Sequence, residues 1–353
     1  MLDAEKDKAF RASANEAANF FNQGHKTTAK DLACNVLDQF LNDEDMEVKD
    51  CKVLDMLCVI LENTNGYVHS LAAFRRIAQL NNVAPFENGF YFFRSLEMSE
   101  DGAQLSDFQP KLSPDQLGRQ IMIACIPKSG STFLFNTLSI ATRFERRKLC
   151  LNYSNEENLL YPPFMERSAC ADTVAQEHLR ASPQNIALIQ AYSTTTVVLV
   201  RNIFDSLISM RDMLLKPETG STTTFFTNEL AAMDEETQLD ATIDKWAHWQ
   251  LEFYASWVRV LSANRVSGYV LTYEQLIENK ASSIIDIAKC VDVPLTHEQA
   301  EQAIIQTEGD AYLSRINQGI SGRGTELMNQ RQIDKIKSMV RYYPDIDFTP
   351  LGL

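Results

Sequence analysis

The chain has 353 residues, with 33 Lys and Arg against 47 Asp and Glu and a formal net charge of −14. This acidic balance argues against nucleic acid as a partner, because nucleic-acid-binding proteins usually present a basic face. It does not exclude a small anionic cofactor, which needs only a few local cations and backbone amides.

Membranes and structural metals are also not expected as partners. No apolar run approaches the ~20 residues of a membrane span, and the N-terminus, MLDAEKDKAF, lacks the apolar segment of a signal peptide. The seven cysteines form no Cys-x-x-Cys pair. A metal site or a disulfide framework is therefore not expected, and a reducing, cytoplasmic compartment is favoured.

The first region, residues 1–100, is predicted to be helical throughout. Apolar residues recur at helical spacing in four segments separated by short polar breaks: AFRASANEAANFF, AKDLACNVLDQFL, VLDMLCVIL and VHSLAAFRRIAQL. Gly24 with Ala29, and Gly66 with Leu71, form a faint echo about 42 residues apart. The echo resembles the helical hairpins of tetratricopeptide arrays, and a plain helical cap is the alternative.

A change of composition follows, and residues 101–117, rich in Asp, Ser, Gln and Pro, are predicted to be a linker. In residues 118–353, apolar strands then alternate with helices. The predicted strands are RQIMIACI, TVAQEHLRA, STTTVVLVRN and SGYVLTYEQL, with helices TFLFNTLSIATRF, SPQNIALIQAY and DKWAHWQLEFYASWVRVLSA among them. This order predicts an α/β domain in which a mostly parallel sheet is covered on both faces.

The loop IPKSGST runs from the first of these strands into a helix. Such a loop directs backbone N–H groups and the positive end of the helix dipole at one small volume, which suits an anion. Gly130 lets a ligand approach the backbone closely, Ser131 and Thr132 offer hydroxyls, and Lys128 brings a compact positive charge. The loop is neither a Walker A motif nor a Rossmann GxGxxG.

A second motif, VVLVRNIFDSLIS, places Arg201 at the end of a strand and Ser209 eight positions later in the following helix. Both side chains can face one phosphate, and the planar guanidinium suits several phosphate oxygens. A local ion pair between Arg201 and Asp205 is the alternative interpretation of this motif.

Together the motifs resemble those of sulfotransferases that use 3′-phosphoadenosine-5′-phosphosulfate (PAPS), over roughly residues 120–330. The resemblance implies a P-loop-like three-layer fold, a 3′-phosphate held by Arg201 and Ser209, and a tyrosine, Tyr273, at the adenine edge. It also implies a glycine-rich segment, RINQGISGRG, that closes over the 3′-phosphate. The residues so implied in the cofactor loop and in this segment are Lys128, Ser129, Gly130, Ser131, Thr132, Phe133, Arg315, Gly319, Gly322 and Arg323.

The chain departs from the family pattern at several of these places. Phe133 stands where the family usually has a tryptophan that stacks on adenine, and Ile203 where many members have proline. Asn317 and Gln318 occupy the places of Arg and Lys, so Arg315 or Arg323 is left to supply the positive charge.

The general base is sought among five histidines. His178 ends a predicted strand between the two phosphate motifs, where the family places its catalytic histidine. Glu177 is the alternative base and points to the opposite face of that strand, Arg180 shares the face of His178, and His248 is predicted to be a packing residue. Lys128 is expected to stabilise charge on the departing oxygen.

The sequence thus predicts a PAPS-dependent sulfotransferase that releases adenosine 3′,5′-bisphosphate (PAP). The expected acceptor is a hydroxyl or amine of a small molecule such as a natural product or alkaloid, with no metal involved. A kinase-like phosphotransferase and an interaction scaffold with a vestigial sulfotransferase domain are the alternatives. Neither the acceptor nor the oligomeric state is encoded in a motif.

Overall fold

The computed structural model of the chain describes residues 2–42, 51–62, 64, 114–150, 157–215, 228–314 and 322–353. The chain divides into two units, Met1–Gln109 and Pro110–Leu353, and each is considered by itself.

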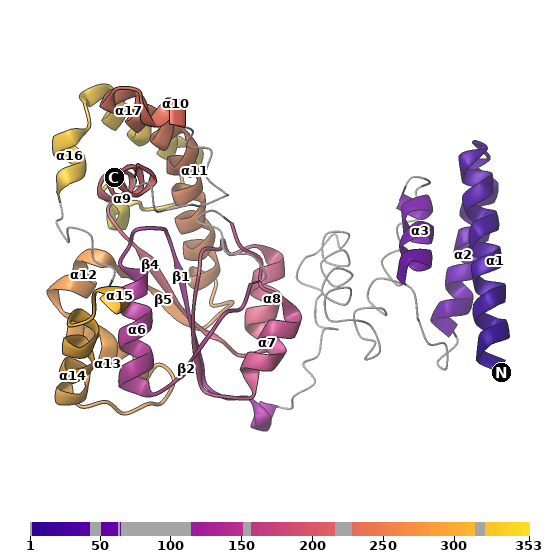
Figure 1. The fold of residues 1–353 in the computed structure, drawn as a ribbon, viewed down its shortest axis with the longest axis horizontal. Helices are drawn as coiled ribbons and strands as arrows, with labels where there is room; N and C mark the ends of the chain where they lie inside the picture. Colours follow the sequence, from indigo (N-terminus) through magenta and orange to yellow (C-terminus); the bar gives the residue numbers. More distant parts are fainter. Residues whose placement is uncertain are drawn as a thin grey trace. The chain divides into compact units, whose positions relative to one another are not determined.

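In the described part of the first unit, three helices pack against one another: α1 (Leu2–Asn22), α2 (Lys26–Asn42) and α3 (Cys51–Glu62) (Figure 1). The chain reverses between α1 and α2 at Gly24, which has a positive φ of 84° that glycine adopts readily. Alanines at the helix crossings allow close approach in the buried cluster of Phe10, Ala14, Ala17, Ala29, Ala33, Val36, Leu37, Leu54, Leu57, Ile60 and Leu61. The predicted fourth helix, the second copy of the echo and most of the predicted linker lie outside the described residues.

The second unit is built on five parallel strands in the order β2-β3-β1-β4-β5. Their bounds are β1 Gln120–Cys125, β2 Glu145–Arg147, β3 Thr173–Glu177, β4 Thr195–Val200 and β5 Gly268–Thr272. Every residue of β1 and β4 is buried, because both strands lie inside the sheet and are covered on both faces. The short edge strand β2 was not predicted, since ERR has no apolar run to mark it.

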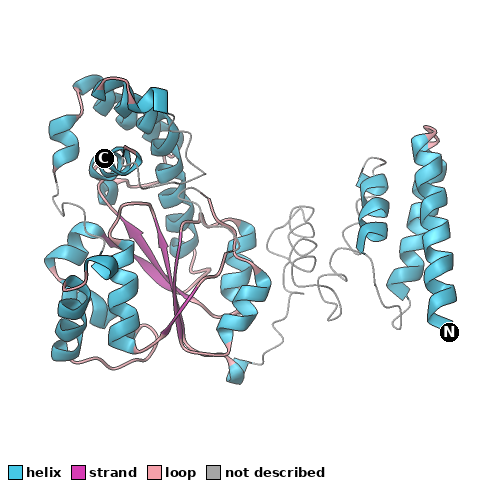
Figure 2. Ribbon diagram, in the orientation of Figure 1, coloured by secondary structure: helices cyan, strands magenta, loops and turns pink. Residues whose placement is uncertain are grey.

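Helices cover both faces of this sheet (Figures 1 and 2). On one face lie α6 (Ser131–Thr142), α13 (Lys280–Lys289) and α14 (His297–Glu308), packed in one apolar cluster with β1, β4 and β5, and near them α12 (Tyr273–Glu278) and α15 (Ala311–Ser314). On the other lie α7 (Pro162–Ala169), α8 (Pro183–Ala191) and α11 (Glu235–Ser262). The other helices among the described residues are α9 (Ile203–Leu214), α10 (Asn228–Ala231), α16 (Arg323–Leu327) and α17 (Gln330–Met339), with short 3-10 helices at Pro114–Gln116, Val340–Tyr342 and Thr349–Leu351. The predicted three-layer α/β fold is confirmed.

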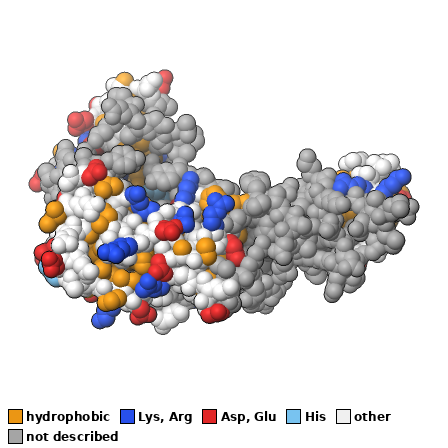
Figure 3. All heavy atoms as spheres, turned by 60° about the horizontal axis from the view of Figure 1, so that its bottom comes forward, with side chains coloured by type: hydrophobic (Ala, Val, Ile, Leu, Met, Phe, Trp, Pro, Cys, Tyr) orange, Lys and Arg blue, Asp and Glu red, His pale blue; other side chains and the backbone are white. Residues whose placement is uncertain are grey.

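Local sequence signals explain where several of these helices begin. Ser182 caps α8 by accepting from the Asn185 amide, and Pro183 is the first residue of the helix. Asn202 caps α9 by accepting hydrogen bonds from the amides of Phe204 and Asp205. No helix in the described parts of the chain is long and apolar enough to cross a membrane. On the face drawn in Figure 3, basic side chains lie among acidic and hydrophobic ones.

Candidate active site

Four of the predicted site residues follow the carboxyl ends of parallel strands. Lys128 follows β1, His178 follows β3, Arg201 follows β4 and Tyr273 follows β5. These strands are neighbours in the order β3-β1-β4-β5, so their carboxyl ends share one edge of the sheet. Ligands of open α/β sheets bind at this edge, beside a central strand from which the chain passes to both sides.

The loop between β1 and α6 contains two residues with left-handed backbone. Lys128 has a φ of 67° and Gly130, which caps α6, has a φ of 80°. The conformation is ordinary for glycine but uncommon for lysine, and such strain gathers at functional sites. Since α6 is 12 residues long and begins at Ser131, its unpaired first amides face the loop and favour an anion.

Side chains brace this loop from within and from β3. Ser129 is fully buried, and its hydroxyl donates to the carbonyl of Ile126 at 2.7 Å, so it supports the turn. The amide of Gln176 donates to the Ser131 hydroxyl at 2.9 Å, whereas Thr132 is half-buried at the start of α6. Sequence analysis missed Gln176; its place in β3, two residues before His178, was the available signal.

Arg201 and the ring of Tyr273 pack against each other and against the loop at Gly130. The Arg201 guanidinium carbon lies 4.3 Å from the centroid of the Tyr273 ring, and its Nη1 donates to the Lys128 carbonyl at 3.1 Å. A Cβ atom on Gly130 would lie 2.9 Å from Cδ2 of Tyr273, so no larger residue fits there without a shift. Tyr273, predicted at a strand end, directly follows β5 and is the buried first residue of α12, which begins there because Thr272 and Gln275 form a capping box.

Helix α9 connects the second motif to the loop. Arg201 is buried just before this helix, and Ser209 is half-buried on it, eight residues further on. The hydroxyl of Ser206 donates to the Pro127 carbonyl at 3.2 Å and so ties α9 to the loop. The first and second motifs are therefore in direct contact.

The glycine-rich third motif is described only from Gly322 onward, and Arg315 and Gly319 lie outside the described residues. Gly322 caps α16 with a φ of 92°. The Arg323 guanidinium donates to the Asp212 carboxylate on α9 at 3.1 Å. Arg323 is thus engaged by a carboxylate in this structure, although it remains a candidate for the missing positive charge.

The aspartate of the second motif also reaches the third motif. Asp205 is buried, and its two carboxylate oxygens accept hydrogen bonds from the amides of Gly322 and Gly324, each at 2.7 Å. Sequence analysis considered Asp205 only as a local partner of Arg201. The signal for its role was the motif itself, which carries an acidic residue in a segment predicted to bind phosphate.

His178 lies directly after β3 and is nearly fully buried. Its Nδ1 atom is 2.8 Å from the carbonyl oxygen of Cys125, the last residue of β1, and 3.4 Å from the Cys125 sulfur. A carbonyl oxygen only accepts, so Nδ1 carries the proton and Nε2 holds the free lone pair. Burial lowers the pKa of His178, although the hydrogen bond to Cys125 opposes this effect. The imidazole is therefore held in the neutral form that a base requires.

Glu177, the alternative base, is engaged elsewhere, as are Arg180, predicted to share the face of His178, and His248. Glu177 accepts a hydrogen bond from the Leu149 amide at 2.7 Å on the opposite side of β3, and burial raises its pKa. Arg180 lies beyond β3 and pairs with the carboxylates of Glu157 and Glu252. The ring of His248 stacks on Tyr342, with 5.8 Å between centroids.

Phe133, predicted to stack on adenine, is only 2% exposed and belongs to the apolar cluster of α6, α13 and α14. The amine of Lys280 lies 5.8 Å from its ring centroid and pairs with Glu308 at 2.5 Å. A base stacking on this ring would therefore have to displace the flexible Lys280 side chain.

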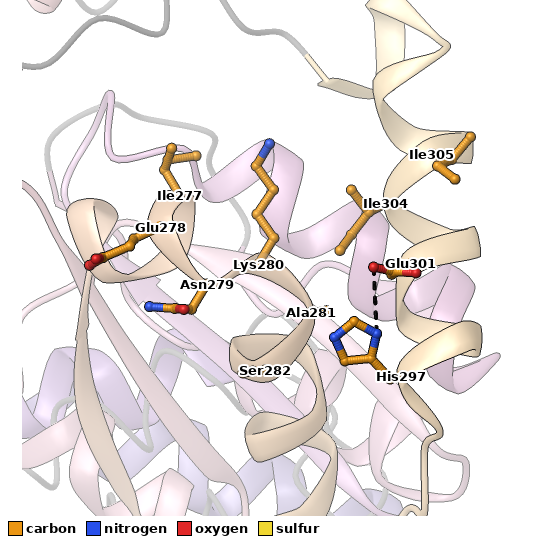
Figure 4. A pocket seen from close by; sticks show the side chains of 10 residues that line it. All are labelled: Ile277, Glu278, Asn279, Lys280, Ala281, Ser282, His297, Glu301, Ile304 and Ile305. Atoms are coloured by element: carbon orange, nitrogen blue, oxygen red, sulfur yellow. Dashed lines mark ion pairs between the residues drawn. The ribbon is translucent and has the colours of Figure 1, made fainter.

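A surface hollow of about 490 Å³ lies between α13 and α14, with the preceding turn at one end (Figure 4). His297 and Glu301, one turn apart on α14, lie 3.5 Å apart at its edge, and Ile304 and Ile305 of the same helix add apolar side chains. It shares none of the predicted site residues. Within the described ranges no group of three His, Cys, Asp or Glu side chains could hold a metal ion.

The family is shown by comparison with known proteins. The model of the sulfotransferase domain matches residues 118–312, more than half of the chain. The chain belongs to the sulfotransferase domain family, and it is a PAPS-dependent enzyme of that class, as the motifs predicted. No curated protein sequence matches it significantly.

The chain is also similar to several solved structures. Mouse sulfotransferase SULT7A1 complexed with PAP shares 12% identity, with a TM-score of 0.49 over 66% of this chain and 86% of that one. Retinol dehydratase in complex with androsterone and PAP shares 13%, with a TM-score of 0.45 over 66% and 83%. Sulfotransferase STF1 from Mycobacterium tuberculosis shares 14%, with a TM-score of 0.39 over 90% and 98%.

Proposed function

We propose that this sulfotransferase transfers the sulfuryl group of PAPS to a hydroxyl or amine of a small-molecule acceptor, by in-line displacement with His178 as the general base. One observation carries the proposal. The strained anion loop, Arg201 and a buried neutral histidine all follow strands that end at the same edge of the sheet. No other edge of this sheet combines an anion loop with a group able to accept a proton, among the residues described.

The residues at this edge fit the cofactor. The first amides of α6 and the loop lysine Lys128 are assigned to the sulfated 5′-phosphate, because a helix N-terminus and a basic side chain both favour an anion. Arg201 and Ser209 are assigned to the 3′-phosphate, and Phe133 and Tyr273 to the adenine. The remaining contacts are assigned to Ser129, Gly130, Ser131 and Thr132, and to Arg315, Gly319, Gly322 and Arg323 of the third motif.

The chemistry requires little of the protein beyond alignment and charge. PAPS supplies an activated sulfuryl group and a phosphate leaving group. His178 accepts the proton of the acceptor at Nε2, which the hydrogen bond from Nδ1 to Cys125 leaves free. Lys128 stabilises the negative charge that develops on the departing oxygen. Sulfuryl transfer resembles phosphoryl transfer in depending mainly on positioning and electrostatics.

The acceptor is assigned only as a class. A natural product or alkaloid fits a small-molecule enzyme, and the net charge of −14 tolerates a cationic acceptor. A cytoplasmic location agrees with the free thiols of Cys34, Cys125, Cys150, Cys170 and Cys290. Residues 118–353 are assigned to catalysis, residues 101–117 to a linker and residues 1–100 to a helical region of tetratricopeptide type or a plain cap.

Calorimetry with nucleotides tests the proposal against both alternatives. The full chain should bind adenosine 3′,5′-bisphosphate in the presence of EDTA and should bind ATP weakly with or without magnesium. A kinase-like phosphotransferase would instead bind ATP tightly only with magnesium. A scaffold with a vestigial domain would bind neither nucleotide, and that result would reject the proposal.

A further inference from the structure

The start of α16 is held against α9 by one carboxylate. Oδ2 of Asp205 accepts from the Gly322 amide and Oδ1 accepts from the Gly324 amide, each at 2.7 Å. The side chain is 3% exposed, so both hydrogen bonds are shielded from water. Hydrogen bonds between an ionised carboxylate and backbone amides are short and strong, and here both oxygens are used.

Gly324 makes this contact possible because it has no side chain. A Cβ atom at this position would lie 2.3 Å from the carbonyl carbon of Phe204 and 2.5 Å from the Asp205 nitrogen. Backbone therefore lies directly on backbone at the first turn of α9. The second contact between the two helices, from Arg323 to Asp212, lies two turns further along α9.

Asp205 also stands between the two residues assigned to the 3′-phosphate. Arg201 precedes it by four residues and Ser209 follows it by four. Residues four apart on a helix share a face, so Ser209 lies one turn beyond Asp205 on α9. A carboxylate without donors would repel a phosphate at this place. The hydrogen bonds from the two amides offset that charge, so the carboxylate is compatible with a phosphate nearby.

We propose that Asp205 is a positioning residue for recognition of the 3′-phosphate. It does not touch the phosphate; it fixes Gly322–Gly324 beside Arg201 and Ser209, so that the second and third motifs form one binding site. This inference rests on the proposed function, because it presumes that Arg201 and Ser209 hold the 3′-phosphate. It extends that function by assigning Asp205, the acidic residue of the second motif, to the positioning of the third motif.

The variant Asp205→Asn tests the inference by replacing one acceptor oxygen with a donor that faces an amide. Affinity for adenosine 3′,5′-bisphosphate should fall about tenfold or more, the cost of an unsatisfied buried amide. Affinity for adenosine 5′-phosphate, which lacks the 3′-phosphate, should change less than about twofold. Calorimetry of the full chain measures both.

A capping variant far from the motif controls for a general loss of stability. Thr296 caps α14 by accepting from the Gln299 amide at 3.2 Å, so Thr296→Ala should lower the melting temperature but leave the ratio of the two affinities unchanged. If Asp205→Asn also leaves that ratio unchanged, Asp205 is merely structural and the inference is wrong.

Two further measurements separate the possible failures. If Arg201→Ala fails to alter the ratio, the assignment of the 3′-phosphate is wrong and the proposed function loses its basis. If Arg201→Ala alters it and Asp205→Asn does not, only the present inference fails. Should Asp205→Asn not fold, amide hydrogen exchange on the wild-type chain without ligand decides: slow exchange at Gly322 and Gly324 supports the clamp, and fast exchange there contradicts it.

Discussion

The Nδ1 atom of His178 lies 2.8 Å from the carbonyl oxygen of Cys125, the last residue of the neighbouring strand β1. The same strand end leads directly into the anion loop. The hydrogen bond therefore fixes the tautomer of the imidazole. It also fixes the position of the ring relative to the loop that begins at Ile126. Burial raises the pKa of the Cys125 thiol to about 12, so this sulfur stays neutral beside the ring.

Replacing the histidine should remove the base without removing the cofactor site. His178→Ala should slow transfer to an alkyl alcohol by roughly 10²–10⁴-fold while PAP affinity stays nearly unchanged. An acidic phenol, which ionises without help, should be affected least. Steady-state rates with both acceptors, together with calorimetry, measure these effects.

The neighbouring carboxylate supplies a matched control. Glu177→Gln keeps an oxygen that can accept from the Leu149 amide and removes a buried charge, so activity should be retained. Loss of alcohol sulfation in Glu177→Gln, with normal rates in His178→Ala, would mean that the base has been misassigned.

The pH dependence should report the environment of His178. A base works in its unprotonated form, and burial lowers the pKa of His178 below its ordinary value of 6.5. The decrease of kcat/KM on the acid side should therefore have its midpoint below pH 6.5, and it should be absent in His178→Ala. Because the unfolded chain binds this proton more readily, the free energy of unfolding should also decrease as the pH drops below 6.5. An acid limb at or above that value that persists in His178→Ala would contradict the assignment.

Arg201 and Ser209 should distinguish nucleotides by their 3′-phosphate. Arg201→Lys keeps the charge but loses the planar fork, and it should weaken PAP binding by about tenfold. Ser209→Ala should weaken it by a smaller factor, and neither change should alter binding of adenosine 5′-phosphate to the same extent. Equal losses for both nucleotides, measured by calorimetry, would show that this pair does not hold the 3′-phosphate.

Gly130→Ala should cost more stability than backbone strain alone. The new methyl group meets the Tyr273 ring at 2.9 Å in addition to the strain of a φ of 80°. Gly322→Ala has a φ of 92° but no atom within 4 Å of the added carbon, so it measures the strain by itself. In thermal unfolding, the free energy of unfolding of Gly130→Ala should be about 1–3 kcal/mol lower than that of Gly322→Ala, the range for overpacking. Equal stability of the two variants would mean that Tyr273 does not press on the loop.

Much of this site could be predicted from the sequence because its determinants are local. The apolar runs of β1 and β4 predict these strands, and the loop after each run predicts where the strand ends. Parallel pairing then brings Lys128, His178 and Arg201 to one edge of the sheet. The contacts of Asp205, Gln176 and Cys125 join segments distant in sequence, with Asp205 reaching residues 117 and 119 positions away. Such pairings depend on how the elements pack. The predicted strand SGYVLTYEQL extended beyond Thr272, whereas the capping box of Thr272 and Gln275 ends the strand there and starts a helix at Tyr273.

The central claim is tested most directly by transfer of a radiolabelled sulfuryl group from PAPS to a panel of alcohols, phenols and amines in the presence of EDTA. The wild-type chain should label at least one acceptor without any added metal. Lys128→Ala should slow this transfer by roughly 10²–10³-fold, as loss of a preorganised charge at the leaving oxygen does, while PAP still binds. Labelling that requires magnesium, or that proceeds equally well in Lys128→Ala, would contradict the account.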